Sequence, residues 1–404
     1  MKMRLWIKYS VMSVCFVMVF VLPACGVQKE KNVRCGAENI SEYINVLAHK
    51  NVAVVANQAS LIGKVHLVDF LLAKGISINK IFSPEHGFRG DVDAGEKFNN
   101  AKDRKTGLPI ISLYGKHFKP SVSDVKGIDV FVFDLQDVGV RFYTYISTLH
   151  YVMEVCAEQK IPLIVLDRPN PNAYYIDGPV LKPRYKSFVG MHPVPIVYGM
   201  TIGEYAQMIN GEGWLKRGMR CDLTVVSCQN WARDSFYELS VKPSPNLPNA
   251  LSVALYPSLC LFEGTVVSVG RGTNFPFQCY GHPLITNGDF TYQPGSISGV
   301  SKYPKFKGEK CYGTDLQCLD LRTLRSKRKI NLSYLIDAFQ ELGTRTTFFN
   351  SFFRNLAGTE KLRKQIEAGL SEKKIRESWQ KDIQIFKEIR KKYLIYPDIR
   401  NDDR

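Results

Sequence analysis

Residues Ile76–Gly90, which read ISINKIFSPEHGFRG, decide how the first half of the chain folds. The apolar first part of this stretch predicts a short buried strand, and Pro84 ends it because proline has no N–H to donate to a ladder. A carboxylate, an imidazole and a guanidinium follow within five residues, from Glu85, His86 and Arg89. Ligands of open α/β sheets bind at the carboxyl ends of strands, so Glu85 is a candidate acid/base group. The alternative is that Glu85 only caps the following turn.

The region between residues 50 and 230 alternates short apolar runs with helical stretches. The helical stretches are Leu67–Lys74, closed by a glycine, and the amphipathic segment Ser147–Gln159. Near-continuous apolar strands separated by helices are typical of a parallel sheet that is covered on both faces. The sequence therefore predicts an α/β fold, a Rossmann-like doubly wound parallel sheet. Its expected strands, besides Ile76–Phe82, are Val52–Ala56, Ile110–Leu113, Asp129–Leu135, Leu163–Asp167 and Leu223–Val226.

The first residues have the features of a bacterial lipoprotein signal. Three basic residues precede the apolar run Val11–Leu22, which is short for a membrane span, and small residues follow it. The sequence Leu22-Pro23-Ala24-Cys25 resembles a lipobox, where cleavage precedes a cysteine that is then lipid-modified. We expect residues 1–24 to be a lipoprotein signal peptide, Cys25 to be the lipidation site and residues 25–39 to be a tether. The alternative is an ordinary secretory peptide that is cleaved nearby.

The remaining chain is long enough for two domains. We expect a Rossmann-like domain over residues 40–240 and a C-terminal α+β auxiliary domain over residues 241–404. The proline-rich segment Pro243–Asn249 resembles a linker between them. The charged, helix-periodic sequence from residue 331 to residue 393 predicts two or three helices. Thr201 and Glu204 fit a capping box, so we expect Glu204 to begin a helix and to take no part in catalysis.

Charge and cysteine content narrow the choice of partner and compartment. The formal net charge of +16 suggests an acidic surface or an anionic substrate. Nucleic acid is the other usual partner of such a charge, but an exported protein rarely meets it, so we expect no nucleic-acid partner. Besides one cysteine in the leader and Cys25, eight cysteines are scattered along the chain, and their spacing does not predict a pairing.

The sequence contains no motif for a cofactor or a metal. After the first predicted strand stands Asn57-Gln58-Ala59-Ser60 instead of the dinucleotide fingerprint, and there is no Walker loop. His86, Asp134 and Asp137 lack the spacing of a known metal motif. No Gly-x-Ser-x-Gly elbow supports a hydrolase with a serine nucleophile. We therefore expect neither a cofactor nor a metal.

Polar residues gather where the predicted strands end, at one edge of the sheet. One polar strand end is ordinary, but four in one sheet predict a polar crevice. In the second half of the chain, Glu263 and Arg271 lie among glycines, where backbone can approach a ligand closely. The candidates at the strand ends, besides Glu85, His86 and Arg89, are Asn57, Asp134, Asp137, Arg141, Tyr143, Arg168 and Asn170.

These residue types suit chemistry on sugars. Aromatic rings pack on pyranose faces, and a carboxylic acid with a raised pKa can protonate a glycosidic oxygen, which is the role expected of Glu85. Arginines could hold an acidic group on the sugar by bidentate pairing, although each one taken singly is more often a structural ion-pair partner. The candidates for a second carboxylate are Asp134, Asp137 and Glu263. The candidate arginines are Arg141, Arg168 and Arg271.

Four long motifs follow one another along the chain. They are Phe82–Gly90, Phe133–Tyr145, Asp167–Pro171 and Leu261–Thr265, the last continued by Ser268–Thr273. Together they resemble the motifs of the NamZ-type exo-β-N-acetylmuramidases, glycoside hydrolase family 171. The similarity runs from about residue 51 to the C-terminus, and the motifs are long and ordered.

The resemblance implies an active-site cleft between a Rossmann-like domain and a C-terminal auxiliary domain. It implies release of N-acetylmuramic acid from the non-reducing ends of peptidoglycan-derived MurNAc–GlcNAc fragments, with Glu85 as the catalytic glutamate and no cofactor. The lactyl carboxylate of muramic acid would explain the arginines. Motif positions expected to line the pocket are His86, Asp134, Arg141, Tyr143, Arg168 and Arg271.

Two functions of other classes stay open at this point. One is a non-catalytic envelope lipoprotein that binds muropeptides or glycans in the same crevice. The other is an esterase or amidase that acts on cell-wall material. In all three cases the lipobox suits a protein of the cell envelope, with a lipid anchor on the periplasmic side of a Gram-negative membrane.

Overall fold

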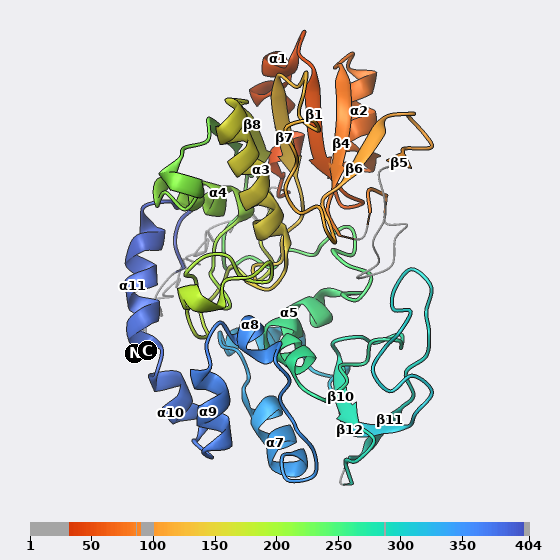
Figure 1. Ribbon diagram of the computed structural model, residues 1–404, viewed down its shortest axis with the longest axis vertical. Helices are drawn as coiled ribbons and strands as arrows, with labels where there is room; N and C mark the ends of the chain where they lie inside the picture. The colour runs from red at the N-terminus through yellow and green to blue at the C-terminus, as the bar shows by residue number, and fades with distance from the viewer. Residues whose placement is uncertain (1–31, 86, 90–100, 287, 400–404) are drawn as a thin grey trace, which may run out of the picture. The chain divides into compact units, whose positions relative to one another are not determined.

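A seven-stranded sheet forms the centre of the first half of the chain in the computed structural model (Figure 1). The structure describes residues 32–85, 87–89, 101–286 and 288–399. The strand order is β5-β6-β4-β1-β7-β8-β9, and neighbouring strands are parallel except for the short edge strand β5. The strands are β1 Val52–Ala56, β4 Ile78–Ser83, β5 Ala101–Lys102, β6 Pro109–Ser112, β7 Val130–Asp134, β8 Leu163–Leu166 and β9 Leu223–Val226.

This topology confirms the predicted α/β class and explains where a site can form. From β1 the chain crosses to β4 and β6 on one side, then returns to β7, β8 and β9 on the other side of β1. The loops after β4 and β7 therefore leave the sheet in opposite directions at its carboxyl edge, and a crevice opens at such a switch point. Glu85 follows β4 at this edge.

Alternation along the strands divides the apolar core into two layers. In β1, Ala53 and Val55 face one cluster, whereas Val52 and Val54 face the other. The first layer is closed by α3 Tyr145–Gln159 and α4 Ile202–Gly211, and the second by α1 Ile44–Leu47 and α2 Leu67–Ala73. Both faces are covered because successive side chains of a strand point to opposite sides.

Residues just before the first strand also pack on the sheet. Two short 3-10 helices, η1 Gly36–Glu38 and η2 Ile40–Glu42, precede α1. Ala37 is fully buried, and the Gly36 N–H donates to the Asp167 carbonyl over 2.7 Å. A short hairpin, β2 Leu61–Ile62 and β3 Val65–His66, precedes α2. The last residues of the segment predicted as a tether therefore belong to the packed part of the chain.

The C-terminal part combines a small sheet with helices, as an α+β arrangement should. Strands β10 Cys279–His282, β11 Phe290–Tyr292 and β12 Cys311–Asp315 form an antiparallel sheet in the order β10-β12-β11. The first helical elements are α5 Ala250–Leu259, η5 Cys260–Gly264 and α6 Leu321–Ser326. The later helices are α7 Ser333–Leu342, α8 Phe353–Ala357, α9 Lys361–Glu367, α10 Glu372–Glu377 and α11 Gln380–Lys391.

The prediction of two or three helices between residues 331 and 393 is wrong, because the structure has five, α7 to α11. The helical periodicity is present, but the chain breaks it repeatedly. Gly358 and Gly369 follow α8 and α9 with φ of 72° and 68°, a left-handed conformation that ends a helix at low cost. Short helices separated by such turns keep one apolar face each on the common core.

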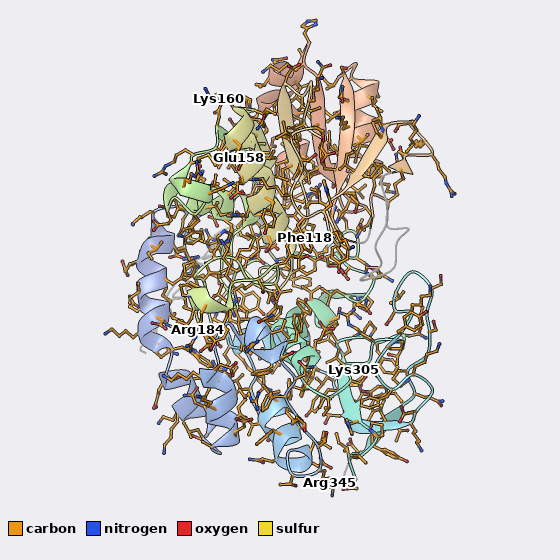
Figure 2. All side chains as sticks on the ribbon, in the orientation of Figure 1. Phe118, Glu158, Lys160, Arg184, Lys305 and Arg345 are labelled. Atoms are coloured by element: carbon orange, nitrogen blue, oxygen red, sulfur yellow. The ribbon has the colours of Figure 1, made fainter. Side chains whose placement is uncertain are left out.

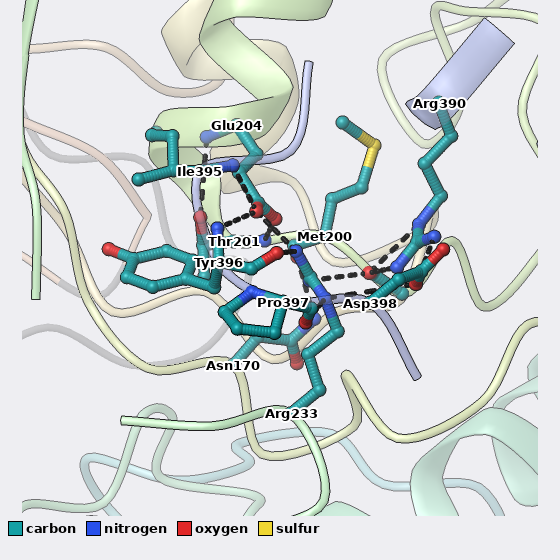
Figure 3. A network of polar contacts seen from close by, with 12 residues as sticks. Asn170, Met200, Thr201, Glu204, Arg233, Arg390, Ile395, Tyr396, Pro397 and Asp398 are labelled. Atoms are coloured by element: carbon teal, nitrogen blue, oxygen red, sulfur yellow. Dashed lines mark hydrogen bonds and ion pairs between the residues drawn. The ribbon is translucent and has the colours of Figure 1, made fainter. Parts of the chain in front are cut away.

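The end of the chain returns to the first half, where a buried polar network holds it (Figure 3). Thr201 and Glu204 form the predicted capping box at the start of α4. The other Glu204 oxygen, Oε1, accepts from the backbone N–H of Ile395 over 2.8 Å and pairs with the buried Arg233. Tyr396 in turn donates to the Asp167 carboxylate over 2.6 Å. Glu204 is thus structural, as predicted.

Two further features concern the cysteines and the helices of the described residues. Their eight cysteines are all free, and seven of them are buried. Across the same residues, no helix is both long and apolar enough to span a lipid bilayer.

Candidate active site

A small pocket with a volume of about 60 Å³ lies between the carboxyl edge of the large sheet and the C-terminal part. Its walls come from the turn after β4, the start of α3, the proline-rich segment after residue 243, helix α5 and the glycine-rich loop after η5. The lining residues are Glu85, Phe142, Tyr143, Thr144, Tyr145, Ser244, Asn246, Leu247, Tyr256, Arg271 and Phe277. Of the residues predicted for the site, the pocket brings together Glu85, Tyr143 and Arg271.

Glu85 enters the pocket because of how β4 ends. The Ser83 carbonyl still accepts from the Leu113 N–H over 2.8 Å, and Pro84 then turns the chain out of the sheet. The half-buried Glu85 carboxylate accepts a hydrogen bond from the Tyr114 hydroxyl, which follows β6. Burial, followed by the charge of Glu85 and this hydrogen bond, raises the pKa of Tyr114. Tyr114 therefore keeps its proton and orients the glutamate.

Glu263 and Arg271 form an ion pair next to this glutamate. The Arg271 Nε lies 2.6 Å from Oε1 of Glu263, with 30% and 25% of the two side chains exposed. The charges of Arg271 and Glu263, like that of Glu85, act on the pKa of Tyr114, so all three charged groups lie near this phenol. The Arg271 guanidinium also lies over the Phe277 ring, 5.2 Å from its centroid. A residue of the loop after β4, Glu85, and a residue of the loop after η5, Arg271, therefore line the same pocket.

The ammonium group of a lysine from a distant loop holds the segment that carries Glu263. The Lys305 ammonium (labelled in Figure 2) donates to the carbonyls of Phe262, Thr265 and Val267 over 3.1, 2.6 and 3.1 Å. Burial lowers the pKa of Lys305 to about 8. Lys305 was not among the predicted residues, and no local sequence signal points to it, because its three partners lie about 40 residues away.

Two tyrosines form the floor of the pocket. The Tyr143 hydroxyl donates to the Pro243 carbonyl over 2.6 Å, and the Tyr145 hydroxyl accepts from Asn57 Nδ2 over 2.8 Å. Their rings meet edge to face with centroids 4.7 Å apart. Burial raises the pKa of both hydroxyls, so they stay neutral. Asn57, predicted to bind substrate, is fully buried and acts through Tyr145.

Asp134 and Arg168 lie away from the pocket and bind each other. Arg168 donates through Nε and Nη2 to the two oxygens of Asp134 over 2.5 and 2.8 Å. Asp134 is fully buried and Arg168 is 5% exposed. Arg168 also donates to the Leu61 carbonyl over 3.1 Å. This bidentate geometry favours a structural role for both residues over the predicted catalytic and substrate-binding roles.

Three further candidates are buried without reaching the pocket lining. Asp137 accepts from the Gly139 N–H and from Tyr198, and burial raises its pKa to about 6. Arg141 donates only to backbone carbonyls, one of them that of Leu356 in α8, and burial lowers its pKa to about 9. Asn170 Nδ2 donates to the Met200 carbonyl. Most of these contacts join loops within the first half of the chain, and the Arg141 bond to Leu356 joins that half to the C-terminal part.

The last two candidates are Arg89 and His86. Arg89 is 29% exposed and pairs with Asp69 over 3.0 Å and with Asp103 over 2.8 Å. Its two carboxylate partners explain its position without a ligand. His86, predicted to bind substrate, lies outside the described residues, as does Cys25. In the described parts of the chain, no three His, Cys, Asp or Glu side chains come together as a metal site would require.

Sequence reasoning missed most of the aromatic lining. Tyr114, which contacts Glu85 from outside the lining, was missed as well; it follows a predicted strand, so the rule that found Glu85 could have found it. Ser244, Asn246 and Leu247 belong to the segment that resembled a linker, and the structure uses that segment as a pocket wall. Tyr256 comes from α5, where a buried tyrosine is indistinguishable from a core residue by sequence alone.

The fold and the site define the class of protein. It is an α/β protein with a doubly wound sheet and an α+β C-terminal part, and its enzyme-like pocket holds Glu85 at the carboxyl ends of the strands. Residues 52–251 match the family model described as exo-beta-N-acetylmuramidase NamZ, N-terminal, and residues 254–396 match the C-terminal model of the same family. The chain belongs to the NamZ exo-β-N-acetylmuramidase family, which confirms the resemblance of the four motifs.

Individual relatives cover nearly the whole chain. The peptidoglycan beta-N-acetylmuramidase NamZ of Bacillus subtilis (strain 168) is 39% identical over 388 residues, 91% of this chain and 92% of the relative. A solved DUF1343 family protein of Bacteroides fragilis is 46% identical, with a TM-score of 0.85 over 91% of this chain and 100% of its own. A second one from the same species is 28% identical, with a TM-score of 0.75 over 90% and 99%.

Proposed function

We propose that this protein is a glycoside hydrolase that releases N-acetylmuramic acid from the non-reducing ends of peptidoglycan fragments, with Glu85 as general acid/base. One observation carries the assignment of the residue: among the described residues that line the pocket, Glu85 is the only carboxylate. The Bacillus subtilis relative, named as a peptidoglycan beta-N-acetylmuramidase, supports the reaction.

The geometry provides the groups that this reaction needs. Glu85, when protonated, donates its proton to the glycosidic oxygen as the C–O bond breaks, and its carboxylate then takes a proton from the incoming water. Tyr114 fixes the orientation of the carboxyl group throughout. The aromatic lining supplies ring faces and hydroxyl groups for the sugar. The Pro243 carbonyl holds the Tyr143 hydroxyl in place, and the Asn57 side chain holds the Tyr145 hydroxyl.

Arg271 is the group best placed to recognise the lactyl carboxylate. Its Nε binds Glu263, and within the described residues no protein acceptor engages its two terminal nitrogens. Stacking over Phe277 fixes the plane of the guanidinium, which favours a bidentate contact with an anion. Glu263 is the second carboxylate that the geometry favours, because Asp134 is paired with Arg168 and Asp137 is sealed in the core.

The decisive experiment compares a chromogenic β-N-acetylmuramide with the matching β-N-acetylglucosaminide. Wild-type protein should cleave only the first, and Glu85→Gln should lower kcat at least a hundredfold, the usual size of a general acid/base contribution. Asp69→Asn, a change in the carboxylate pair of Arg89, is the matched control and should keep wild-type turnover. Full turnover by Glu85→Gln would show that another residue does the chemistry.

We further propose that the protein is a lipoprotein of the cell envelope, anchored through Cys25 on the periplasmic side of a Gram-negative membrane. The basic start, the apolar run and the sequence Leu22-Pro23-Ala24-Cys25 support this proposal. Cells fed a labelled fatty acid should label the wild-type protein and not Cys25→Ala. Equal labelling of both, or a mature N-terminus elsewhere than Cys25, would contradict it.

A further inference from the structure

We propose that a row of four aromatic side chains leading away from Glu85 forms a platform that holds the sugar units of the glycan beyond the one released. The four residues, here called the aromatic row, are Tyr114, Phe118, Phe188 and Tyr151. This inference rests on the proposed function, since it names where the rest of the substrate chain binds.

Ring contacts make the row continuous. Tyr114 meets Phe118 edge to face with centroids 6.3 Å apart, and Phe118 stacks on Phe188 at 4.0 Å. Phe188 and Tyr151 lie nearly parallel, with 15° between their planes and 6.4 Å between centroids. The residues come from the loop after β6, the loop after η3 Pro183–Tyr185 and helix α3. Three separate segments therefore build one apolar strip.

The row is a surface feature and not part of the core. All four side chains are partly exposed, and none belongs to the buried clusters of the molecule. Phe118, which is labelled in Figure 2, is held beside α3 by its neighbour Lys119. That lysine forms ion pairs with Glu154 and Glu158 of the helix. Partly exposed aromatic side chains in a contiguous strip are unusual on a protein surface and mark binding sites.

The row begins at the proposed catalytic group. Tyr114 donates its hydroxyl hydrogen bond to Glu85, yet it is not among the residues that line the pocket. Glu85 thus stands between two surfaces, the pocket and the aromatic row. A sugar held in the pocket and a sugar lying on the row would be joined by the bond next to Glu85. This division suits an enzyme that removes one terminal unit from a chain.

Charge beside the row fits a glycan that carries carboxylates. Lys116 and Lys186 are exposed and stand two residues from Phe118 and Phe188 in the same loops. In the described part of the chain neither lysine forms an ion pair, whereas the nearby Glu154 and Glu158 are already paired with Lys119 and Asp124 is paired with His117. Chains of amino sugars with lactyl or peptide carboxylates would meet cations at this rim and apolar rings at the centre.

The test measures how affinity depends on chain length. Glu85→Gln protein, which should bind without turnover, is titrated calorimetrically with a peptide-free MurNAc–GlcNAc disaccharide and with the corresponding hexasaccharide. The hexasaccharide should bind more tightly. In the same background, Phe118→Leu and Phe188→Leu should reduce the ratio of the two affinities about tenfold, the usual effect of losing one aromatic anchor.

Matched variants separate the platform from other effects. Leucine keeps apolar volume at both positions, and unfolding curves verify that each variant folds. Tyr303→Ala removes an aromatic ring that is 80% exposed elsewhere on the molecule, so its affinity ratio should equal that of the parent. Tyr114→Phe keeps the ring but loses the hydrogen bond to Glu85, so it should shift the pH profile of disaccharide cleavage and leave the affinity ratio unchanged.

The outcomes distinguish this inference from the proposed function. Equal affinity for both chain lengths, or an unchanged ratio in both leucine variants, would refute the platform even if the wild-type protein cleaves muramides. The wild-type protein could instead cleave no muramide and yet bind the hexasaccharide more tightly than the disaccharide, with a difference that depends on Phe118. That result would refute the proposed function and support the platform.

Discussion

Replacing Asp134 by asparagine tests whether this carboxylate serves stability or chemistry. Asp134 has no exposed surface, and both of its oxygens accept from Arg168, which is itself 5% exposed. The variant leaves the guanidinium charge buried without a counter-ion, and breaking such a pair costs about 3–5 kcal/mol. Because a folded domain is stable by only about 5–15 kcal/mol, this loss should be plain in an unfolding experiment.

The assay is urea unfolding followed by tryptophan fluorescence, together with turnover measured at low temperature, where the variant is still folded. We expect a large shift of the unfolding midpoint and turnover within a few fold of wild type. Asp129→Asn is the matched control. This exposed aspartate directly precedes the first residue of β7 and accepts a hydrogen bond from the Asn51 N–H, so its replacement should cost about 1 kcal/mol or less.

A compensating variant checks the physical reason. Asp134→Leu combined with Arg168→Met removes both charges and should recover much of the lost stability, since an apolar pair of similar volume often replaces a buried ion pair without cost. A wild-type unfolding midpoint for Asp134→Asn, accompanied by a loss of turnover of a hundredfold or more, would refute this reasoning. Asp134 would then be a catalytic carboxylate, as the sequence suggested.

Three other predictions concern single residues, namely Tyr145, His150 and Gly358. Tyr145→Phe removes the hydrogen bond from Asn57 and should lower stability by about 1 kcal/mol and kcat severalfold, as measured by urea unfolding and muramide turnover. Burial lowers the pKa of His150 to about 4, so in this pH range the unfolded chain takes up a proton that the folded protein does not. The free energy of unfolding should therefore fall by up to about 3 kcal/mol as the pH drops from 6.5 to 4. His150→Gln should flatten this part of the pH–stability curve. Gly358→Ala should cost about 1–3 kcal/mol in the same unfolding assay, because φ is +72° and the added methyl carbon would lie 2.6 Å from an Arg141 nitrogen.

Local sequence pattern was sufficient for the large sheet. The strand β1 has the predicted bounds, Val52–Ala56, and β9 has the predicted bounds Leu223–Val226. β1 is covered on both faces and is therefore apolar along its whole length, so its limits are visible in the sequence. β9, at the edge of the sheet, is only partly buried, and Thr224 is exposed. The same reasoning placed Glu85 at a strand end, and with it the edge of the sheet where the pocket lies.

Local pattern was insufficient for short helices and for the aromatic walls. The region after residue 331 has the period of a helix throughout, and the turns that divide it depend on backbone conformations such as that of Gly358. Likewise, Pro243–Asn249 has the composition of a linker whether it spans open solvent or closes a pocket. What decides between the two is the Tyr143 hydroxyl, which binds the Pro243 carbonyl from 100 residues away.

The amino-acid sequence by itself determined the α/β class, the family and the position of Glu85, because these depend on residues that are neighbours in the chain. Only the tertiary structure decided which charged residues meet a ligand and which meet each other. Asp134 and Arg168 are 34 residues apart and Glu263 and Arg271 are 8 apart, yet the first pair is sealed in the core and the second remains partly exposed beside the pocket. The difference is one of burial, which is set by how distant segments pack and cannot be read from either residue's neighbours.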